Sequence, residues 1–197
     1  MRVVLPSIER PKKLPVVLGR NEVRRLLRAP KLLKHRLVLA MLYGCGLRNF
    51  ELCNLQLKDL DLERMMLHIR QGKGRKDRYV PLCAMQVRGL RKYISAERPV
   101  TWCFNGNDSK GDPVALSTTG VQWIVREARK HSGIQKEVTT HSLRHSYATH
   151  LLEMGLDIIS VKDLLGHADI QTTLTYLHVA QLGRQRPFSP LERLYNK

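Results

Sequence analysis

Apolar residues recur every three or four positions over most of this chain, and polar residues fill the positions between them. That spacing places the apolar side chains on one face of a helix. Residues suited to begin a helix, such as Asn21, Ser117, Asp157 and Asp169, stand at the starts of several of these stretches. The pattern therefore predicts helices over 21–27, 31–43, 48–55, 84–97, 117–131, 140–155, 157–167 and 169–180.

One segment departs from the helical spacing. Within residues 64–82, the strings RMMLHIR and RYVPL flank the basic, glycine-rich string QGKGRKD, which predicts a β-hairpin. Residues 98–116 are rich in proline, glycine, asparagine and aspartate and predict the longest irregular connection. The expected fold class is mainly α with a small antiparallel β-sheet (α+β). We expect one main domain at 16–180, after a linker at 1–15 and before a C-terminal tail at 181–197.

The charge of the chain narrows the class of partner. The 197 residues include 34 Lys and Arg against 17 Asp and Glu, which gives a formal net charge of +17. Such an excess favours a protein that binds a polyanion, most commonly nucleic acid, over a merely basic soluble protein. Only 6% of the residues are aromatic, which argues against base stacking as the main means of holding nucleic acid.

The cysteines and the apolar runs indicate the cellular setting. Cys45, Cys53, Cys83 and Cys103 form no CxxC pair, and the first residues lack the pattern of a signal peptide. We therefore expect reduced thiols and a cytoplasmic protein. The most apolar stretch, residues 37–47, is too short to span a bilayer and predicts a buried helix.

The string HSLRHSYATHLLEMG, residues 141–155, carries three histidines and one arginine within its first ten positions. At about 100° per residue, His141, Arg144 and His145 share one face of the predicted helix, and His150 lies roughly opposite His141. The three histidines cannot converge on one metal ion, and a zinc-protease helix would need a glutamate directly after the first histidine. His141 and Arg144 at a helix N-terminus are suited instead to a phosphate.

Three further strings contain residues that could perform chemistry, and each also has a structural explanation. In GCGLRNFEL, Arg48 could form a surface salt bridge with Glu51, and the GKGRK string could be a solvated turn. In LLGHADIQTTLTYLH, His167 could cap the preceding helix, and Tyr176 could be a core residue of an amphipathic helix. The glycines of GKGRK do not open a helix and no Lys-Ser or Lys-Thr pair follows, so this string is not a nucleotide-binding P-loop.

Taken together and in order, the four strings resemble the signature of the tyrosine recombinases, the phage integrase family. The matching features are G-L-R-x-x-E-L, a lysine in a glycine-flanked hairpin, H-x-L-R-H, L-L-G-H, and a tyrosine nine residues after the last histidine. The chain looks most like the bacterial Xer-type branch. The resemblance covers roughly residues 15–180 and implies the catalytic-domain fold of that family.

The resemblance implies a catalytic role for six residues. Arg48 and Arg144 would clamp the scissile DNA phosphate, and His141 and His167 would bind its oxygens or help to move protons. Tyr176 would attack the phosphorus and form a 3′-phosphotyrosyl link. Lys73 of the hairpin would protonate the departing 5′-oxygen.

The resemblance also implies a supporting role for Glu51, which would hold Arg48 or a histidine in place. We further expect a set of cations to contact DNA around the site, namely Arg75, Lys76, Arg78 and His145.

These residue types suit the chemistry. A tyrosine has an unperturbed pKa near 10, so it needs a proton acceptor or positive surroundings to attack at neutral pH. Two guanidinium groups can bind the charged non-bridging oxygens bidentately, in place of the metal ions that nucleases use. The phosphotyrosyl bond retains the energy of the broken phosphodiester, so rejoining needs no ATP. We therefore expect no metal, no nucleotide and no other cofactor.

The expected partner is double-stranded DNA, with no role for a membrane. The resemblance implies a homo-oligomer on DNA, or a pair with a related recombinase, because the segment after the tyrosine commonly packs on a neighbouring protomer in this family. It also implies that an N-terminal DNA-clamping domain precedes the linker at 1–15, and that domain is absent from this chain. The activity could serve integration, excision or resolution, as in a mobile element.

Three other classes of function stay open at this stage. A DNA-binding protein without catalysis would explain the charge but not the ordered motifs. A type IB topoisomerase would use the same phosphotyrosyl chemistry to relax supercoils. A metal-dependent nuclease is favoured least, because no carboxylate cluster indicates one.

Overall fold

The computed structural model describes residues 15–70, 77–177 and 179–180. Its helices are α1 (Arg20–Arg28), α2 (Leu33–Gly44), α3 (Asn49–Cys53), α4 (Ala84–Glu97), α5 (Thr118–Ser132), α6 (Thr140–Glu153), α7 (Ile158–Leu165) and α8 (Gln171–Leu174). Its strands are β1 (Leu60–Asp61), β2 (Met66–Ile69), β3 (Arg78–Pro81), β4 (Asn105–Asn107) and β5 (Pro113–Ala115). The expected fold class, mainly α with small antiparallel sheets, is confirmed.

Several local signals act as the sequence predicts. The Ser117 hydroxyl accepts a hydrogen bond from the amide of Gly120 and caps α5, and the Asp157 carboxylate caps α7 in the same way through Ser160. Gly133 and Gly166 end α5 and α7 in the left-handed conformation that favours glycine.

The structure differs from the prediction in two places. Residues 98–116 contain the β4–β5 hairpin, whose first strand is Asn-Gly-Asn, a composition with low β propensity that gave no strand signal. The predicted helix over 169–180 is reduced to the four residues of α8. Its threonines are poor helix formers, and the Thr175 hydroxyl donates to the carbonyl of Thr172.

The three-stranded sheet has the order β1-β2-β3, and all of its pairs are antiparallel. In β3, alternate residues face opposite sides: Val80 is fully buried, whereas Tyr79 is 60% exposed. Arg78 therefore shares the inner face with Val80, although it stands beside the basic hairpin string. The tip of that hairpin, residues 71–76, lies outside the described residues.

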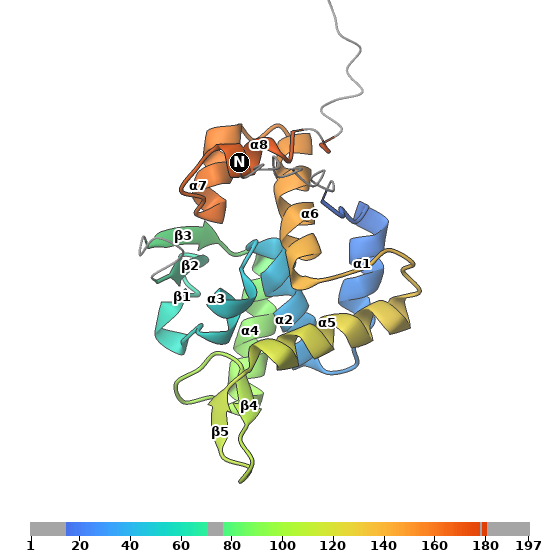
Figure 1. Ribbon diagram of the computed structural model, residues 1–197. Helices are drawn as coiled ribbons and strands as arrows, with labels where there is room; N and C mark the ends of the chain where they lie inside the picture. The colour runs from blue at the N-terminus through green and yellow to red at the C-terminus, as the bar shows by residue number, and fades with distance from the viewer. Residues whose placement is uncertain (1–14, 71–76, 178, 181–197) are drawn as a thin grey trace, which may run out of the picture.

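Helix α6 runs through the middle of the molecule (Figure 1). Helices α7 and α8 lie at one end of the molecule, and the β4–β5 hairpin lies at the opposite end. Most of α6 is buried against α2, α5 and α7. A small apolar cluster packs residues of α6 against α7 and the segment after α8: Tyr147, Ala148, Leu152, Val161, Leu165 and Tyr176. The helical core thus fixes the position of α6 relative to the LLGH turn. In the described part of the chain, no helix is both long and apolar enough to cross a membrane.

Candidate active site

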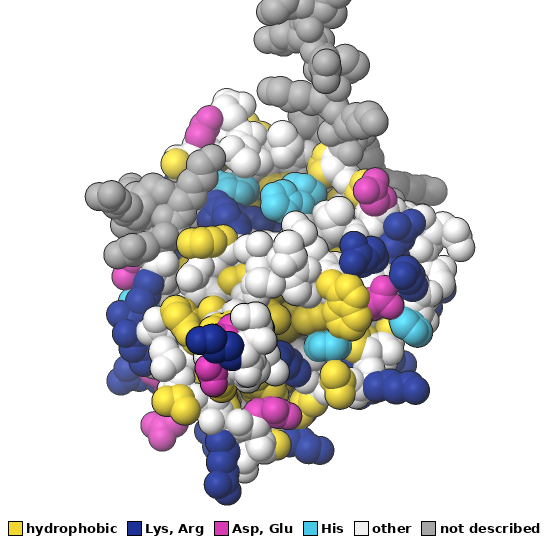
Figure 2. Space-filling view, turned by 60° about the horizontal axis from the view of Figure 1, so that its bottom comes forward, with side chains coloured by type: hydrophobic (Ala, Val, Ile, Leu, Met, Phe, Trp, Pro, Cys, Tyr) yellow, Lys and Arg dark blue, Asp and Glu magenta, His cyan; other side chains and the backbone are white. Residues whose placement is uncertain are grey.

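Predicted site residues from three of the four strings meet in one cleft of about 550 Å³. Its lining comes from α3, the start of α5, α6, the turn after α7, and α8: Arg48, Asn49, Phe50, Thr118, His141, Arg144, His145, His167, Ala168, Asp169, Thr172 and Tyr176. Figure 2 shows histidine side chains directly beside lysine or arginine side chains on the face that this view brings forward. Residues up to 128 positions apart in the sequence are therefore close enough to act on one group.

The N-terminus of α6 presents three of these side chains. The Thr139 hydroxyl accepts a hydrogen bond from the Ser142 amide at 3.1 Å and fixes the first turn of the helix. His141, Arg144 and His145 then lie along the cleft, whereas His150 on the other side of α6 makes a hydrogen bond to the Tyr43 hydroxyl at 2.9 Å. The divergence of the histidines agrees with the helical geometry expected from the sequence.

Glu51 is the common partner of Arg48, Arg78 and Arg144. Its carboxylate accepts hydrogen bonds from Arg48 Nη1 at 2.7 Å and from Arg78 at 2.9 and 2.7 Å, and Arg144 Nη1 lies 3.9 Å away. Burial alone would raise the pKa of Glu51, but Arg78 and then Arg48 lower it to about 2. The carboxylate is therefore ionised at neutral pH and offsets part of the charge of three arginines.

The same three arginines bind three consecutive carbonyls at the C-terminal end of α7. Arg78 Nε donates to Leu164 at 2.9 Å, Arg144 Nη2 to Leu165 at 2.6 Å, and Arg48 Nη2 to Gly166 at 3.0 Å. The last carbonyls of a helix have no partner within the helix and carry partial negative charge. This contact joins the GLR, RYVPL and HSLRH strings to the LLGH turn.

Two glycines permit this close packing. Gly46 has a φ of 58°, and a Cβ there would stand 2.4 Å from Cδ1 of Tyr147. Gly166 has a φ of 62°, and its Cβ would stand 2.9 Å from Nη1 of Arg78. A side chain at either position would strain the backbone and push apart the elements that carry the arginines.

Arg144 is held deep in the cleft. Its side chain is 7% exposed, and Nη1 also donates to the carbonyl of Gly46. Burial, and then the charge of Arg48, lower the pKa of Arg144 to about 10, so it stays charged at neutral pH. A guanidinium has five N–H donors, and the hydrogen bonds of Arg144 to the two carbonyls leave others for an anion in the cleft.

Tyr176 is 2% exposed and lies between two imidazole rings. Its hydroxyl is 3.0 Å from Nδ1 of His145, and its ring stacks on that of His167 with centroids 6.2 Å apart. Burial raises the pKa of Tyr176, and the charges of Arg144 and Arg48 act in the opposite direction. The residue is thus packed in the core and lines the cleft at the same time.

Both imidazoles beside Tyr176 are neutral at neutral pH. Burial, and then His141 and Arg144, lower the pKa of His145 to about 4. Burial, and then Arg144 and Arg48, lower the pKa of His167 to about 3. His167 follows the Gly166 cap, but as a neutral ring it does not act as a cationic helix cap; its Nδ1 bonds instead to the Thr173 hydroxyl at 2.9 Å.

The structure places Arg78 differently from the sequence-based expectation of a DNA contact. Its side chain is 8% exposed and all three nitrogens of the guanidinium bond to Glu51 or Leu164. His145, expected to contact DNA as well, contacts the candidate nucleophile. Lys73, Arg75 and Lys76 lie outside the described residues, so their roles remain predictions.

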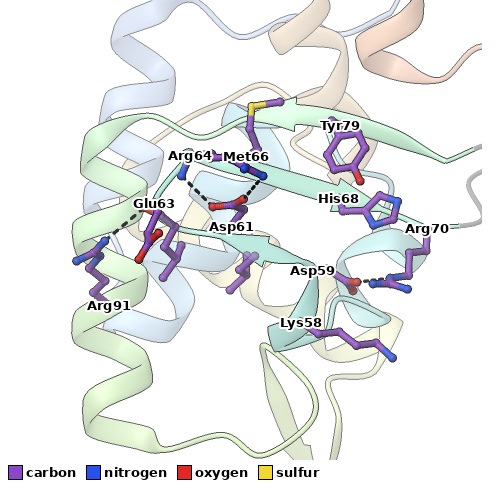
Figure 3. A pocket seen from close by; sticks show the side chains of 12 residues that line it. Lys58, Asp59, Asp61, Glu63, Arg64, Met66, His68, Arg70, Tyr79 and Arg91 are labelled. Atoms are coloured by element: carbon purple, nitrogen blue, oxygen red, sulfur yellow. Dashed lines mark hydrogen bonds and ion pairs between the residues drawn. The ribbon is translucent and has the colours of Figure 1, made fainter.

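A larger cleft of about 950 Å³ lies over the outer face of the β1-β2-β3 sheet (Figure 3). Four of its charged groups form ion pairs with one another: Arg70 with Asp59, and Arg64 with Asp61. Three carboxylates lie among the four lysine and arginine side chains of this lining, which disfavours a phosphate. The smaller cleft, where guanidiniums outnumber carboxylates, is the better candidate for an anionic substrate.

Comparison with known proteins agrees with this arrangement. The model of the phage integrase family matches residues 17–182, which contain every described residue of the cleft.

The chain belongs to the phage integrase family.

Several members of the family are similar over most of the chain. Tyrosine recombinase XerA of Thermococcus kodakarensis is 41% identical over 171 residues, 86% of this chain and 60% of the relative. The crystal structure of XerA recombinase is 32% identical with a TM-score of 0.76, covering 96% of this chain and 65% of that one. A post-cleavage complex of XerH site-specific recombinase with a palindromic difH substrate is 27% identical with a TM-score of 0.72, covering 86% and 51%.

This phage integrase family chain spans about three fifths of the length of the curated relatives it matches. The shared segment is the one that holds the cleft.

Proposed function

We propose that this chain is the catalytic domain of a site-specific DNA recombinase or integrase, which cleaves and rejoins DNA strands through a 3′-phosphotyrosyl link. The observation that carries the proposal is the meeting of Arg48, Arg144 and Tyr176 in one cleft. Two fixed guanidiniums and a phenol are the groups required to hold a phosphodiester and attack it. The XerH complexes with its substrate before and after cleavage support the same kind of partner for this chain.

In this mechanism the scissile phosphate lies between Arg48 and Arg144. Both guanidiniums are already oriented by Glu51 and by the carbonyls at the end of α7, so little reorganisation is needed when charge develops on the phosphate. Their positive charges stabilise the non-bridging oxygens of the pentavalent transition state. His141, the most exposed of the three histidines lining the cleft, and His167 contribute hydrogen bonds to the same oxygens.

Tyr176 then forms a bond to phosphorus while the bond to the 5′-oxygen breaks. We assign protonation of that oxygen to Lys73 of the hairpin. The phosphotyrosyl bond conserves the energy of the phosphodiester, and a 5′-hydroxyl of the same or another strand reverses the reaction. The exchange of strands, rather than hydrolysis, follows from this reversibility.

Double-stranded DNA is the proposed partner, and the charge of +17 supplies the long-range attraction. We assign contacts with the DNA backbone to Arg75 and Lys76. We assign Arg78 instead to the positioning of Glu51, because all three nitrogens of its guanidinium already bond to Glu51 or Leu164. Recombination joins two cleaved sites, so we propose that homo-oligomers, or pairs with a related recombinase, assemble on the DNA.

A covalent trapping experiment tests this function. The substrate is a pool of DNA duplexes randomised on both sides of a single 5′-bridging phosphorothiolate, whose 5′-thiolate product rejoins poorly. We expect a protein–DNA adduct on a denaturing gel at low salt. Tyr176→Phe should lose the adduct and keep DNA binding. Relaxation of a supercoiled plasmid without sequence preference would point to topoisomerase activity, and DNA binding without any adduct would contradict the proposal.

A further inference from the structure

The phenol of Tyr176 needs a partner that takes its proton during attack, and the cleft contains three imidazoles. Among the described residues, His145 is the one whose ring nitrogen lies within hydrogen-bonding distance of the Tyr176 hydroxyl, at 3.0 Å. Nδ1 of His167 is bonded to Thr173, and its ring lies nearly parallel to that of Tyr176, at 20°. Nδ1 of His141 is 3.4 Å from the Thr140 hydroxyl.

We propose that His145 is a catalytic residue that accepts the hydroxyl proton of Tyr176 during DNA cleavage and returns it during rejoining. This inference rests on the proposed function of the cleft and assigns His145 a role different from the DNA contact expected from the sequence.

One covalent bond to phosphorus forms in this step and one breaks. The oxygen of Tyr176 bonds to phosphorus, the bond from phosphorus to the 5′-oxygen breaks, and the phenolic proton moves to Nδ1 of His145. The departing 5′-oxygen takes a proton from a separate donor, for which Lys73 is the proposed group. In rejoining, the His145 imidazolium protonates the departing phenolate as the 5′-hydroxyl attacks.

The surroundings of His145 suit a neutral acceptor. The groups that face it are His141 and Arg144 on α6, Tyr176 beside α8, and His167 after α7. Because burial, His141 and Arg144 lower the pKa of His145, its ring is uncharged at neutral pH and Nδ1 can accept when the proton resides on Nε2.

Proton transfer from Tyr176 to His145 becomes favourable as the reaction proceeds. A DNA phosphate in the cleft adds negative charge beside the ring, which favours the imidazolium. The acidity of the phenolic hydroxyl also increases as its oxygen bonds to phosphorus. Proton transfer and bond formation are therefore coupled in a single step.

Two variants separate a proton acceptor from a residue that only orients Tyr176. His145→Ala removes the acceptor, and His145→Asn keeps a hydrogen-bonding oxygen near Nδ1 but cannot take up a proton. We expect both to slow single-turnover formation of the adduct by about 10²–10⁴-fold. His150→Ala, on the same helix but outside the cleft, is the matched control and should cleave at the wild-type rate.

The phosphorothiolate substrate shows whether a slower reaction is caused by the nucleophile or by the leaving group. Its thiolate leaving group needs no proton, so we expect it to relieve the defect of Lys73→Ala but not that of either His145 variant. Replacement of Tyr176 by the more acidic 3-fluorotyrosine should accelerate the His145 variants by at least about tenfold more than the wild-type protein, because a more acidic phenol depends less on an acceptor.

The outcomes are distinct. If the wild-type protein forms no adduct, the proposed function fails. If it does, each of three results would overturn the role of His145. These are a wild-type cleavage rate in His145→Ala, a wild-type rate in His145→Asn, and no greater acceleration of the His145 variants than of the wild-type protein by fluorotyrosine. Should His145→Ala not fold, the Asn variant with and without fluorotyrosine decides the question.

Discussion

Arg78 on β3 binds both carboxylate oxygens of Glu51 on α3, from Nη1 at 2.9 Å and from Nη2 at 2.7 Å. Both side chains are almost fully buried, at 8% and 5% exposure. Arg78 also binds the carbonyl of Leu164 at the end of α7. Strand β3 is thereby tied to the acid that also bonds to Arg48 and lies close to Arg144.

We expect Arg78→Ala to lower the free energy of unfolding by about 3–5 kcal/mol, because it leaves the buried Glu51 carboxylate short of a partner. It should also slow cleavage, since Arg48 and Arg144 lose their fixed geometry. Urea unfolding and single-turnover trapping measure the two effects. Arg64→Ala breaks an exposed pair with Asp61 and is the matched control, with a cost below about 1 kcal/mol. Equal stability of the two variants would contradict the role of Arg78.

Stability should depend on Glu51 at acidic pH. Its pKa is about 2 in the folded protein and near 4.5 as a free group, so the folded state favours the ionised form. Its contribution is fully present above pH 4.5 and is lost as the pH falls from about 4.5 to about 2. Glu51→Gln should flatten the decline in unfolding free energy over this interval in urea titrations at several pH values. An unchanged slope would show that other groups cause the decline.

Arg144→Ala should lower the single-turnover cleavage rate by at least about 10²-fold, because it removes preorganised donors from the transition state. Arg144→Lys keeps the charge but not the fork of donors, so it should also lose most of the activity. Binding of DNA, measured by anisotropy at low salt, should change by only a few fold, since many other cations contribute. Cleavage by Arg144→Ala at the wild-type rate would contradict the proposed binding of the scissile phosphate by Arg144.

His150 should have a structural role only. It bonds to the Tyr43 hydroxyl on the side of α6 away from the cleft, and a lost hydrogen bond of this kind costs about 1 kcal/mol. We expect His150→Gln to shift the unfolding midpoint slightly and to leave trapping rates unchanged, whereas His141→Gln slows trapping without a comparable change in stability. The reverse pattern would mean that the wrong face of α6 has been assigned to the DNA.

Much of the fold was predictable from local signals. Most of the helices are defined by the apolar spacing, by N-terminal caps such as Ser117 and Asp157, and by glycines at the C-terminal ends. The ordered motifs identify the residues that meet in the cleft. The β4–β5 hairpin was not predictable, because its pairing depends on the turn at Asp108, whose side chain accepts from the amides of Lys110 and Asp112.

The burial of Arg78 against Glu51 was not evident from its neighbours in the sequence, because they are cationic and the hairpin suggested a contact with DNA. Strand alternation was the available signal: Arg78 and Val80 share a face, and Val80 is buried. The contact between His145 and Tyr176 joins α6 to the segment after α7, so no local pattern could have revealed it.

The central claim is that Tyr176 becomes covalently attached to DNA. The most direct measurement is mass spectrometry of the protease-digested adduct from the phosphorothiolate duplex, after nuclease trimming of the DNA. We expect a nucleotide remnant on the peptide that contains Tyr176, with fragmentation placing it on that side chain. A remnant on any other residue, or a cleaved duplex with unmodified protein, would contradict it.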